Sequence, residues 1–308
     1  MDRFSEFESN PRKFLAQSKA MCSYLSDSGH SVVSTHVSPE SACNLSCPYC
    51  SVRGREVGLR LDLSVVKSYI TSLLGRGLRS VILTGGGEPL LYPHINELVL
   101  WLHTQGLFVG LITNGTQSDR MSNWSLLSWV RVSLNEFKGW KERISVPSNQ
   151  IKSLGASVIF SGESLKDFVE KAKMLGCKYL RVLPDCTLDN LDQAHIAIER
   201  EVSKINDSII FHQNKRRAQP SALVCHQAYF RPYLCEDGYV YPCDSVVLDG
   251  SMRFYDKYRI CRADEVAEFL DGKIKMKFKP SCDCGQCVFT ENVNMLDRWK
   301  NLVEGEFV

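Results

Sequence analysis

Between residues 32 and 212 the chain alternates short runs of Val, Ile and Leu with longer segments in which apolar residues recur every three or four positions. The short runs predict strands that are buried on both faces, because their hydrophobic character is nearly continuous. We expect six of them, at 32–38, 80–86, 107–114, 129–135, 156–161 and 179–186. The longer segments predict helices with one core-facing stripe, at Leu63–Leu74, Ile95–Leu102 and Leu165–Leu175.

Repeated strand–helix units indicate the α/β class and a parallel sheet with right-handed crossovers. Six units predict a partial (β/α)6 barrel of the TIM type, over residues 31–213 and preceded by an N-terminal extension, 1–30. In such folds the functional site lies at the C-terminal ends of the strands. Polar and glycine-rich motifs that directly follow strands are therefore candidates for binding and catalysis.

The pattern changes after residue 213, and we expect a second, small domain over 214–308. It opens with an exposed linker, "NKRRAQPS", and Asp237-Gly238 then predicts the turn of a β-hairpin. A short helix at 263–272 and an amphipathic helix at 292–303 follow. The region is small and rich in cysteine, so bound metal can substitute for a large apolar core.

Composition is that of an ordinary soluble enzyme, with 308 residues, 44% hydrophobic and 23% charged. The net charge of +2 predicts no general attraction to nucleic acid or to anionic membranes. The N-terminal sequence lacks the apolar segment of a secretion signal, and no apolar run is long enough to cross a bilayer. We therefore expect a cytoplasmic protein.

Thirteen cysteines are many for a cytoplasmic chain, where disulfides are disfavoured. Four of them stand alone and are best interpreted as packed thiols: Cys22, Cys177, Cys186 and Cys261. The other nine fall within residues 43–50 and 225–287, where clustering indicates metal ligands.

The first cluster, "CNLSCPYC", contains Cys43, Cys47 and Cys50 in a C-x3-C-x2-C spacing. Three thiolates can bind three irons of a cubane cluster, or provide three of the four ligands of a zinc ion. The spacing differs from the paired C-x2-C of zinc knuckles and leaves one position without a local ligand. It therefore favours an iron–sulfur cluster with one open iron.

This motif resembles the signature of the radical S-adenosylmethionine (SAM) superfamily, including the aromatic Tyr49 before the last cysteine. The resemblance continues in order through "GGGEP" (85–89), "ITNGT" (112–116) and "VRVSLN" (130–135), and covers roughly residues 32–186. It implies a [4Fe–4S] cluster bound by the three cysteines, with the fourth iron chelated by the amino and carboxylate groups of SAM.

The resemblance also implies SAM contacts around the cluster. Tyr49 would lie near the adenine. The carbonyls of Gly86 and Gly87 would accept hydrogen bonds from the SAM ammonium, and Glu88 would add a matching negative charge.

Further SAM contacts are expected at the ends of later strands. Ser133 and Asn135 are candidates for the ribose or the carboxylate of SAM, and Arg181 for a carboxylate of SAM or substrate. Thr113 and Asn114 are weaker candidates, because an Asn-Gly pair that ends a strand is also a plain turn.

The reaction implied by the resemblance begins when an electron from the reduced cluster cleaves SAM to methionine and a 5′-deoxyadenosyl radical. That radical removes hydrogen from an unactivated C–H bond. A flavodoxin- or ferredoxin-type protein would donate the electron.

The second cluster contains Cys225, Gly238 and Cys243 in a C-x12-G-x4-C spacing, followed by Cys284 and Cys287. This resembles the twitch domain, a shortened SPASM domain, and implies one auxiliary [4Fe–4S] cluster bound by the four cysteines. A full SPASM domain needs about three further cysteines, so we do not expect a second auxiliary cluster.

The ligand set of this region stays open at two positions. Cys235 or Cys282 can replace one of the four cysteines, and Cys235 can instead be a catalytic thiol that donates a hydrogen atom. A zinc knuckle built from the same four cysteines is also chemically possible.

Our main functional prediction is hydrogen abstraction from a small polar substrate, with an auxiliary cluster taking up an electron so that the substrate is oxidised. One alternative is a radical epimerase or an enzyme that modifies peptides. Another is modification of tRNA or nucleotides, for which "FHQNKRR" (211–217) offers basic residues, although a solvated linker face is the simpler interpretation of this segment. A zinc-binding interaction protein without catalysis is the alternative outside enzymes.

Overall fold

The computed structural model describes residues 11–26, 31–135, 144–186, 188, 190–215, 218–246, 256–284 and 287–301. The chain divides into two compact units. The barrel unit comprises Val37–Leu63 and Ser80–Arg216, and the cysteine-rich unit comprises Met1–His36, Ser64–Arg79 and Arg217–Val308. The domain ranges 1–30, 31–213 and 214–308 stay predictions, and residues 1–10 and 27–30 of the expected extension lie outside the described part.

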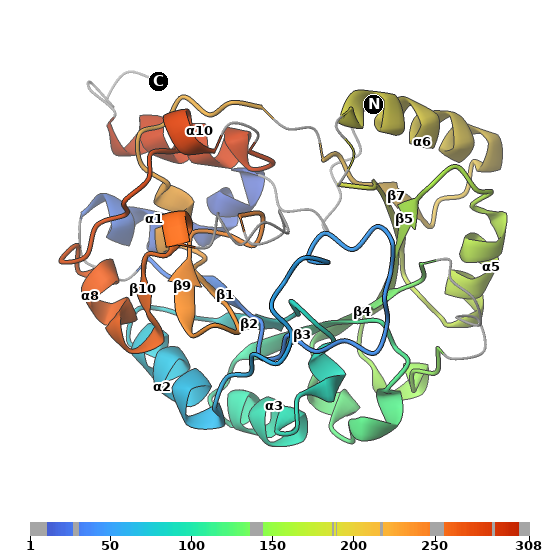
Figure 1. Cartoon of the computed structure of the whole chain (residues 1–308), viewed down its shortest axis with the longest axis horizontal. Coiled ribbons are helices and arrows are strands. Elements are labelled where there is room, and N and C mark those ends of the chain that lie inside the picture. Colours follow the sequence, from blue (N-terminus) through green and yellow to red (C-terminus); the bar gives the residue numbers. More distant parts are fainter. Residues whose placement is uncertain are drawn as a thin grey trace. The chain divides into compact units, whose positions relative to one another are not determined.

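The barrel unit is built on six parallel strands that neighbour one another in chain order (Figure 1). They are β2 (Ser80–Leu83), β3 (Phe108–Thr113), β4 (Trp129–Ser133), β5 (Leu154–Phe160), β6 (Leu180–Pro184) and β7 (Ile210–His212). The first five confirm predicted strands. The sixth was not predicted, because three residues are too few to show a period.

Helices connect these strands; apolar stripes predicted those at Ile95–Leu102 and Leu165–Leu175, whereas the helix at Leu191–Ile205 was not predicted. The helices are α3 (Ile95–Thr104), α5 (Lys166–Met174) and α6 (Leu191–Ile205). Figure 1 shows the three helices on one side of the strands. In α3 the buried residues are Ile95, Leu98, Val99 and Leu102, which is the predicted stripe. The α/β class and the open partial barrel are therefore confirmed.

The two faces of the sheet differ in polarity, which strand β4 shows. Val130 and Val132 are fully buried, whereas Trp129, Arg131 and Ser133 on the opposite face are half-buried. Because side chains alternate across a strand, Trp129, Arg131 and Ser133 share one face, which we call the inner face. An arginine and a serine on this face contrast with the branched apolar side chains that fill closed barrels.

Aromatic rings occupy the space above glycines on neighbouring strands. Gly110 lies opposite Trp129 in register, and a Cβ at Gly110 would come within 2.4 Å of the Trp129 ring. A Cβ at Gly155 would likewise meet the Tyr179 ring at 2.3 Å. The guanidinium of Arg131 lies 5.7 Å from the centre of the Trp129 ring, on the same face. These rings pack the inner face below the strand ends.

The cysteine-rich unit contains a small sheet and several short helices. Its strands follow the order β10 (Cys261–Arg262), β9 (Tyr239–Tyr241), β8 (Tyr233–Leu234) and β1 (Ser34–Val37). Its helices are α1 (Ser18–Leu25), α2 (Leu63–Leu74), α8 (Val266–Leu270), α9 (Pro280–Asp283) and α10 (Thr290–Lys300). The predicted hairpin is confirmed, since β8 and β9 pair antiparallel around Gly238, whose φ is +82°.

A separate apolar core holds α1 and α10 of this unit together. Met21, Phe230 and Leu296 are almost fully buried in it, and Phe14 packs edge-on against Phe230. None of the helices that the structure describes is both long enough and apolar enough to cross a bilayer.

Candidate active site

Residues 38–62, which we call the cysteine loop, contain the C-x3-C-x2-C motif and belong to the barrel unit. The base of the loop is pinned by Glu40, which is only 1% exposed. Its carboxylate accepts hydrogen bonds from the Ala42 backbone at 2.9 Å and from Arg60 Nε at 2.5 Å. The Ser41 backbone donates to the Leu59 carbonyl at 2.9 Å. These contacts close the loop at its two ends and leave the cysteines between them.

The cysteine loop is joined to the glycine-rich turn after β2. Gly87 N–H donates to the Glu40 carbonyl at 2.9 Å, and Glu88 N–H donates to the Ala42 carbonyl at 2.8 Å. A Cβ at Gly87 would lie 2.0 Å from the Ala42 carbonyl oxygen. The absence of a side chain at Gly87 is therefore needed for the loop to pack against the turn, besides any contact with a ligand.

Gly86 directly precedes Gly87 in the glycine-rich turn. Its backbone N–H donates to the Ser38 hydroxyl at 2.6 Å. This bond ties the turn to the start of the cysteine loop.

Glu88 connects the turn after β2 with the end of β3. Its carboxylate accepts hydrogen bonds from the Thr113 hydroxyl at 2.5 Å, the Asn114 backbone at 2.7 Å and the Leu90 backbone at 3.0 Å. Only 2% of Glu88 is exposed, and this burial raises the pKa of its carboxyl although the three donors act against the shift. Glu88 and Thr113 therefore hold the two strand ends together.

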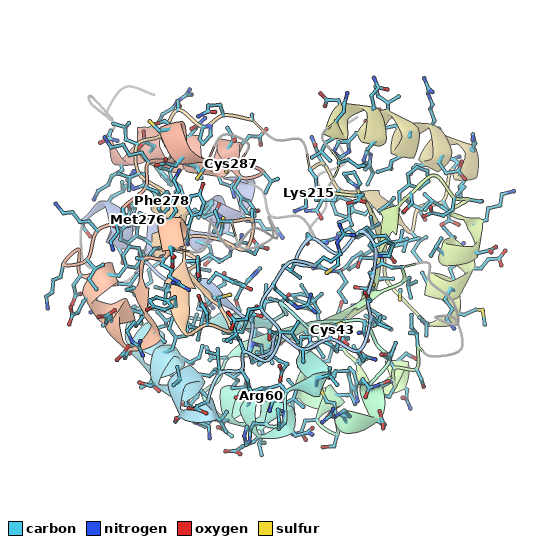
Figure 2. The ribbon with its side chains drawn as sticks, in the orientation of Figure 1. Cys43, Arg60, Lys215, Met276, Phe278 and Cys287 are labelled. Atoms are coloured by element: carbon cyan, nitrogen blue, oxygen red, sulfur yellow. The ribbon has the colours of Figure 1, made fainter. Side chains whose placement is uncertain are left out.

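The structure brings Cys43, Cys47 and Cys50 together. Burial raises the pKa of the Cys43 and Cys47 thiols, and the Cys50 thiol raises both further by charge repulsion. The guanidinium of Arg55 acts in the opposite direction on Cys43 and Cys47. The Leu45 backbone N–H points at Cys43 Sγ at 3.4 Å. Cys43 is labelled on this loop in Figure 2.

Polar side chains surround the same thiols. A hydrogen bond with the buried Tyr49 side chain partly offsets the raised pKa of Cys47. Asn114 Nδ2 lies 4.0 Å from Cys43 Sγ and also donates to Asn44 Oδ1 at 3.0 Å. Asn114 thus links the end of β3 to the cysteine loop, which is a more specific position than a plain turn would give it.

The donor set of the cysteine loop fits a cubane cluster. Across the described ranges no three His, Cys, Asp or Glu side chains converge closely enough to ligate one metal ion. A cubane makes no such demand, since each thiolate binds a different iron, and it favours N–H donors directed at sulfur. Cys43 has such a donor in Leu45 N–H, and the thiols of Cys47 and Cys50 lie near it.

Two predicted ligand-binding residues lie in one row across the inner face. Ser133 on β4 pairs in register with Ser157 on β5, which in turn pairs with Arg181 on β6. All three side chains therefore lie at one level of the sheet. The side chain of Asn135 instead accepts a hydrogen bond from the Ile159 backbone at 3.0 Å, so it supports the end of β5.

The four predicted auxiliary cysteines also lie together, within the cysteine-rich unit. Burial raises the pKa of Cys225 and of Cys284 to about 12, and nearby thiols add to both shifts. Cys243 is affected by Cys225 and Cys287 in the same way. The Phe289 backbone N–H points at Cys287 Sγ at 3.3 Å. Thiols from three separate places in the sequence thus share one site.

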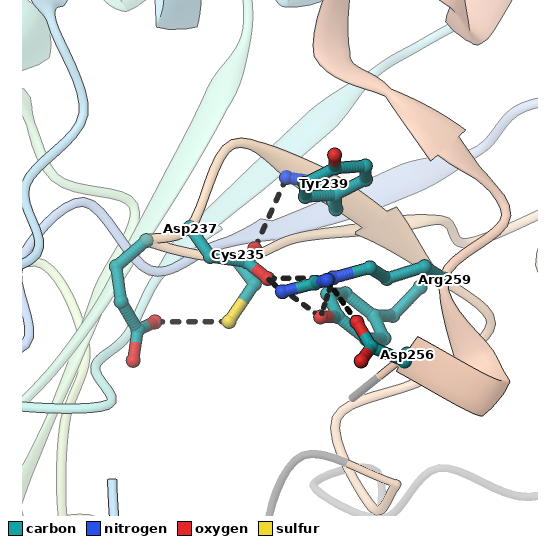
Figure 3. Close-up of polar contacts among 7 residues, drawn as sticks. Cys235, Asp237, Tyr239, Asp256 and Arg259 are labelled. Atoms are coloured by element: carbon teal, nitrogen blue, oxygen red, sulfur yellow. Dashed lines mark hydrogen bonds and ion pairs between the residues drawn. The ribbon is translucent and has the colours of Figure 1, made fainter. Parts of the chain in front are cut away.

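The other two cysteines of this region have different neighbours. Cys235 is 2% exposed, and its thiol donates to Glu236 Oε2 at 3.1 Å within the β8–β9 hairpin (Figure 3). Burial, followed by the negative charge of Glu236, raises its pKa well above the usual value, so it carries its proton at neutral pH. Cys282 is exposed beside Ser281. Nearby thiols do not contribute to the Cys235 shift.

The predicted basic segment is described only in part. The Lys215 backbone donates to Nε2 of the buried His195 at 3.1 Å, and His195 Nδ1 lies 2.8 Å from His212 Nε2 at the end of β7. Arg216 and Arg217 lie outside the described residues.

Sequence reasoning missed several residues of the site. Ser157 can be assigned to the site only from its strand register with Ser133 and Arg181. Asn44 can be assigned only from its hydrogen bond with Asn114. Arg55 follows the cysteines in a segment without periodicity, so no sequence pattern indicates it.

Comparisons with known proteins place this site in a family context. A family model described as the Radical SAM superfamily matches residues 37–138, which include the cysteine loop, the glycine-rich turn and β4. A GTP 3′,8-cyclase of Chlorobaculum tepidum is 39% identical over 95 residues, covering 30% of this chain and 28% of that protein. An S-adenosylmethionine-dependent nucleotide dehydratase of Flammeovirga pacifica is 24% identical over 174 residues, covering 46% and 60%.

Among solved structures, native anSMEcpe with bound AdoMet and Cp18Cys peptide aligns with a TM-score of 0.54 at 14% identity, covering 85% of this chain and 88% of that chain. At that identity the likeness concerns the fold. The chain spans less than two thirds of the length of the curated relatives it matches.

We predict that Gly87→Ala removes the cluster at the cysteine loop. The added Cβ would overlap the Ala42 carbonyl and push the loop away from the turn. Anaerobic iron counting should find about four irons fewer than in the wild type. Gly75→Ala is the control, since its Cβ would meet its nearest neighbour at 3.9 Å. Full iron content in Gly87→Ala would contradict the packing argument.

Proposed function

Because the chain carries a radical SAM domain, as its cysteine motif predicted, we propose that it cleaves SAM reductively and abstracts hydrogen from a C–H bond of a small polar substrate. The observation that carries the proposal is the grouping of Cys43, Cys47 and Cys50 on a loop fastened to Gly87 and Glu88. A bound [4Fe–4S] cluster would supply the single electron that this cleavage needs.

The residues of the chain would bind and orient the cofactors. Cys43, Cys47 and Cys50 would bind three irons and leave the fourth to the amino and carboxylate groups of SAM. The carbonyls of Gly86 and Gly87 remain the proposed acceptors for the SAM ammonium. Glu88 already accepts three hydrogen bonds, so we assign its main role to positioning the turn.

Further along the sheet, Ser133 and Arg181 are the proposed partners of the SAM carboxylate or ribose, because register places them at one level. Tyr49 is proposed near the adenine. Thr113 and Asn135 act through their hydrogen bonds to Glu88 and Ile159, which support the neighbouring strand ends.

We assign Cys225, Cys243, Cys284 and Cys287 to one auxiliary [4Fe–4S] cluster in a twitch-like domain. Four thiolates would saturate it, so it would supply an electron acceptor rather than a substrate-binding site, and the net reaction would be a dehydrogenation. A zinc knuckle is disfavoured, because the same chain already carries the cysteine motif of an iron–sulfur protein.

A nucleotide substrate is the second candidate. Two curated relatives are named for GTP and for a nucleotide, and Arg131 and Arg181 both lie on strands of the barrel unit with half-buried side chains. Arginine is well suited to bind phosphate. A peptide substrate is the further alternative, in line with the peptide bound by the anSMEcpe structure. Soaks with nucleoside phosphates, aminocyclitols and peptides would separate the three classes.

The proposed reaction predicts that reconstituted protein releases 5′-deoxyadenosine when SAM and dithionite are supplied without oxygen. Cys47→Ala should lower the rate at least about 100-fold, the scale expected when an essential catalytic group is lost, because the cluster loses one of three ligands. Cys22→Ala should match the wild type, since Cys22 is exposed on α1. Colourless protein that contains zinc and no iron would establish an interaction protein instead.

The auxiliary site predicts about eight irons per chain in the wild type and about four in Cys284→Ala. Cys282→Ala is the matched control, because Cys282 is exposed two residues away, and it should retain about eight. Equal iron loss in both variants would contradict the proposed ligand set.

The Cys235→Ala variant distinguishes oxidation of the substrate from its epimerisation. Dehydrogenation predicts an oxidised product, no deuterium uptake from D2O, and normal turnover in Cys235→Ala. An epimerase would instead incorporate deuterium and stall in this variant, because the thiol would be the hydrogen donor. Cys261→Ala controls for the loss of a buried thiol in the same unit. Mass spectrometry of the product measures both outcomes.

A further inference from the structure

Arg55 places a positive charge beside the three cysteines of the cysteine loop. Its NH1 atom lies 3.9 Å from Cys50 Sγ. Arg55 is half-buried, so water screens this charge less than it would at the open surface. Arg55 therefore provides a fixed cation next to a proposed thiolate ligand.

Backbone carbonyls on both sides of the cysteines hold the guanidinium in place. Arg55 Nε donates to the Ser41 carbonyl at 2.6 Å, and NH1 donates to the Val52 carbonyl at 3.0 Å. Ser41 is itself fixed, because its hydroxyl accepts from the Gly58 and Leu59 backbones at 2.9 and 2.8 Å. The planar fork of arginine can make these bonds together, whereas a lysine ammonium offers only a point charge.

We propose that Arg55 sets the reduction potential of the cluster at Cys43, Cys47 and Cys50, and that it shifts this potential upward. This inference rests on the cluster of the proposed function. Reduction adds one electron and hence one negative charge to the cluster. A fixed cation next to a thiolate ligand stabilises that added negative charge. The reduction potential of an iron–sulfur cluster depends on its net charge, on the hydrogen bonds to its sulfurs and on its exposure to solvent. The electron comes from a low-potential one-electron donor, for which dithionite serves in vitro.

Glu88 is another charged group near the sulfurs, and its carboxylate raises the pKa of Cys43. Leu45 N–H and Asn114 Nδ2 approach Cys43 Sγ as neutral donors at 3.4 and 4.0 Å. Arg55 NH1, in contrast, is a positively charged donor that lies 3.9 Å from Cys50 Sγ. We therefore assign the charge effect to Arg55, as a residue that acts through the cluster.

Arg53 offers a matched control two residues away. It is an exposed arginine of the same loop, and its NH1 donates to the Pro48 carbonyl at 3.1 Å. It makes no described contact with a thiol. Arg53→Gln removes the same charge from the loop without removing the group beside Cys50.

The test is a redox titration of anaerobically reconstituted full-length protein, followed by electron paramagnetic resonance. The signal that changes when SAM is added identifies the cluster at the cysteine loop and separates it from the auxiliary cluster. Arg55→Gln should shift its midpoint potential to a more negative value with unchanged iron content. Arg53→Gln should keep the wild-type potential.

An unchanged potential in Arg55→Gln, or an equal shift in Arg53→Gln, would overturn the proposal. If Arg55→Gln binds no iron at the loop, Arg55→Met is measured in the same way. Loss of the cluster from both variants would mean that Arg55 acts by folding the loop, which also overturns it. If the wild type itself forms no cluster that responds to SAM, the proposed function fails instead.

Discussion

The site depends on the backbone contact between the cysteine loop and the glycine-rich turn after β2. Gly87 and Glu88 donate to the carbonyls of Glu40 and Ala42, and the missing Cβ of Gly87 makes room for Ala42. Three thiols on a long loop can bind one cluster only if the loop has a single conformation. The entropy of fixing that loop is offset by these buried hydrogen bonds and by Glu40, whose carboxylate connects Ala42 and Arg60.

Glu88 shows how a motif residue can support the site through hydrogen bonds within the protein. Its carboxylate joins the turn after β2 to Thr113 and Asn114 at the end of β3. Asn114 in turn reaches Cys43 and Asn44 on the cysteine loop. One continuous set of hydrogen bonds therefore passes from the second and third strands to the first cysteine, and a buried, fully bonded carboxylate is the rigid point from which it starts.

Much of this arrangement could be predicted from the sequence, for identifiable reasons. The strands from β1 to β6 are apolar runs, the helices α2, α3 and α5 have clear 3.6-residue stripes, and Asp237-Gly238 marks the hairpin. Patterns of this kind involve only residues that are near one another in the sequence, so they can be recognised without the structure. Strand β7 could not be predicted, since its three residues show no period. Arg55 and Ser157 act through distant carbonyls and strand register, which a linear motif does not encode.

The most direct test of the account is the coordination of SAM itself. Reduced, anaerobic protein would be studied by electron–nuclear double resonance with SAM that carries 15N in the amino group and 17O in the carboxylate. The account predicts hyperfine coupling of both labels to the cluster spin, lost in Cys47→Ala. Bound SAM whose labels show no coupling in the wild type would contradict a cluster that the protein leaves one thiolate short.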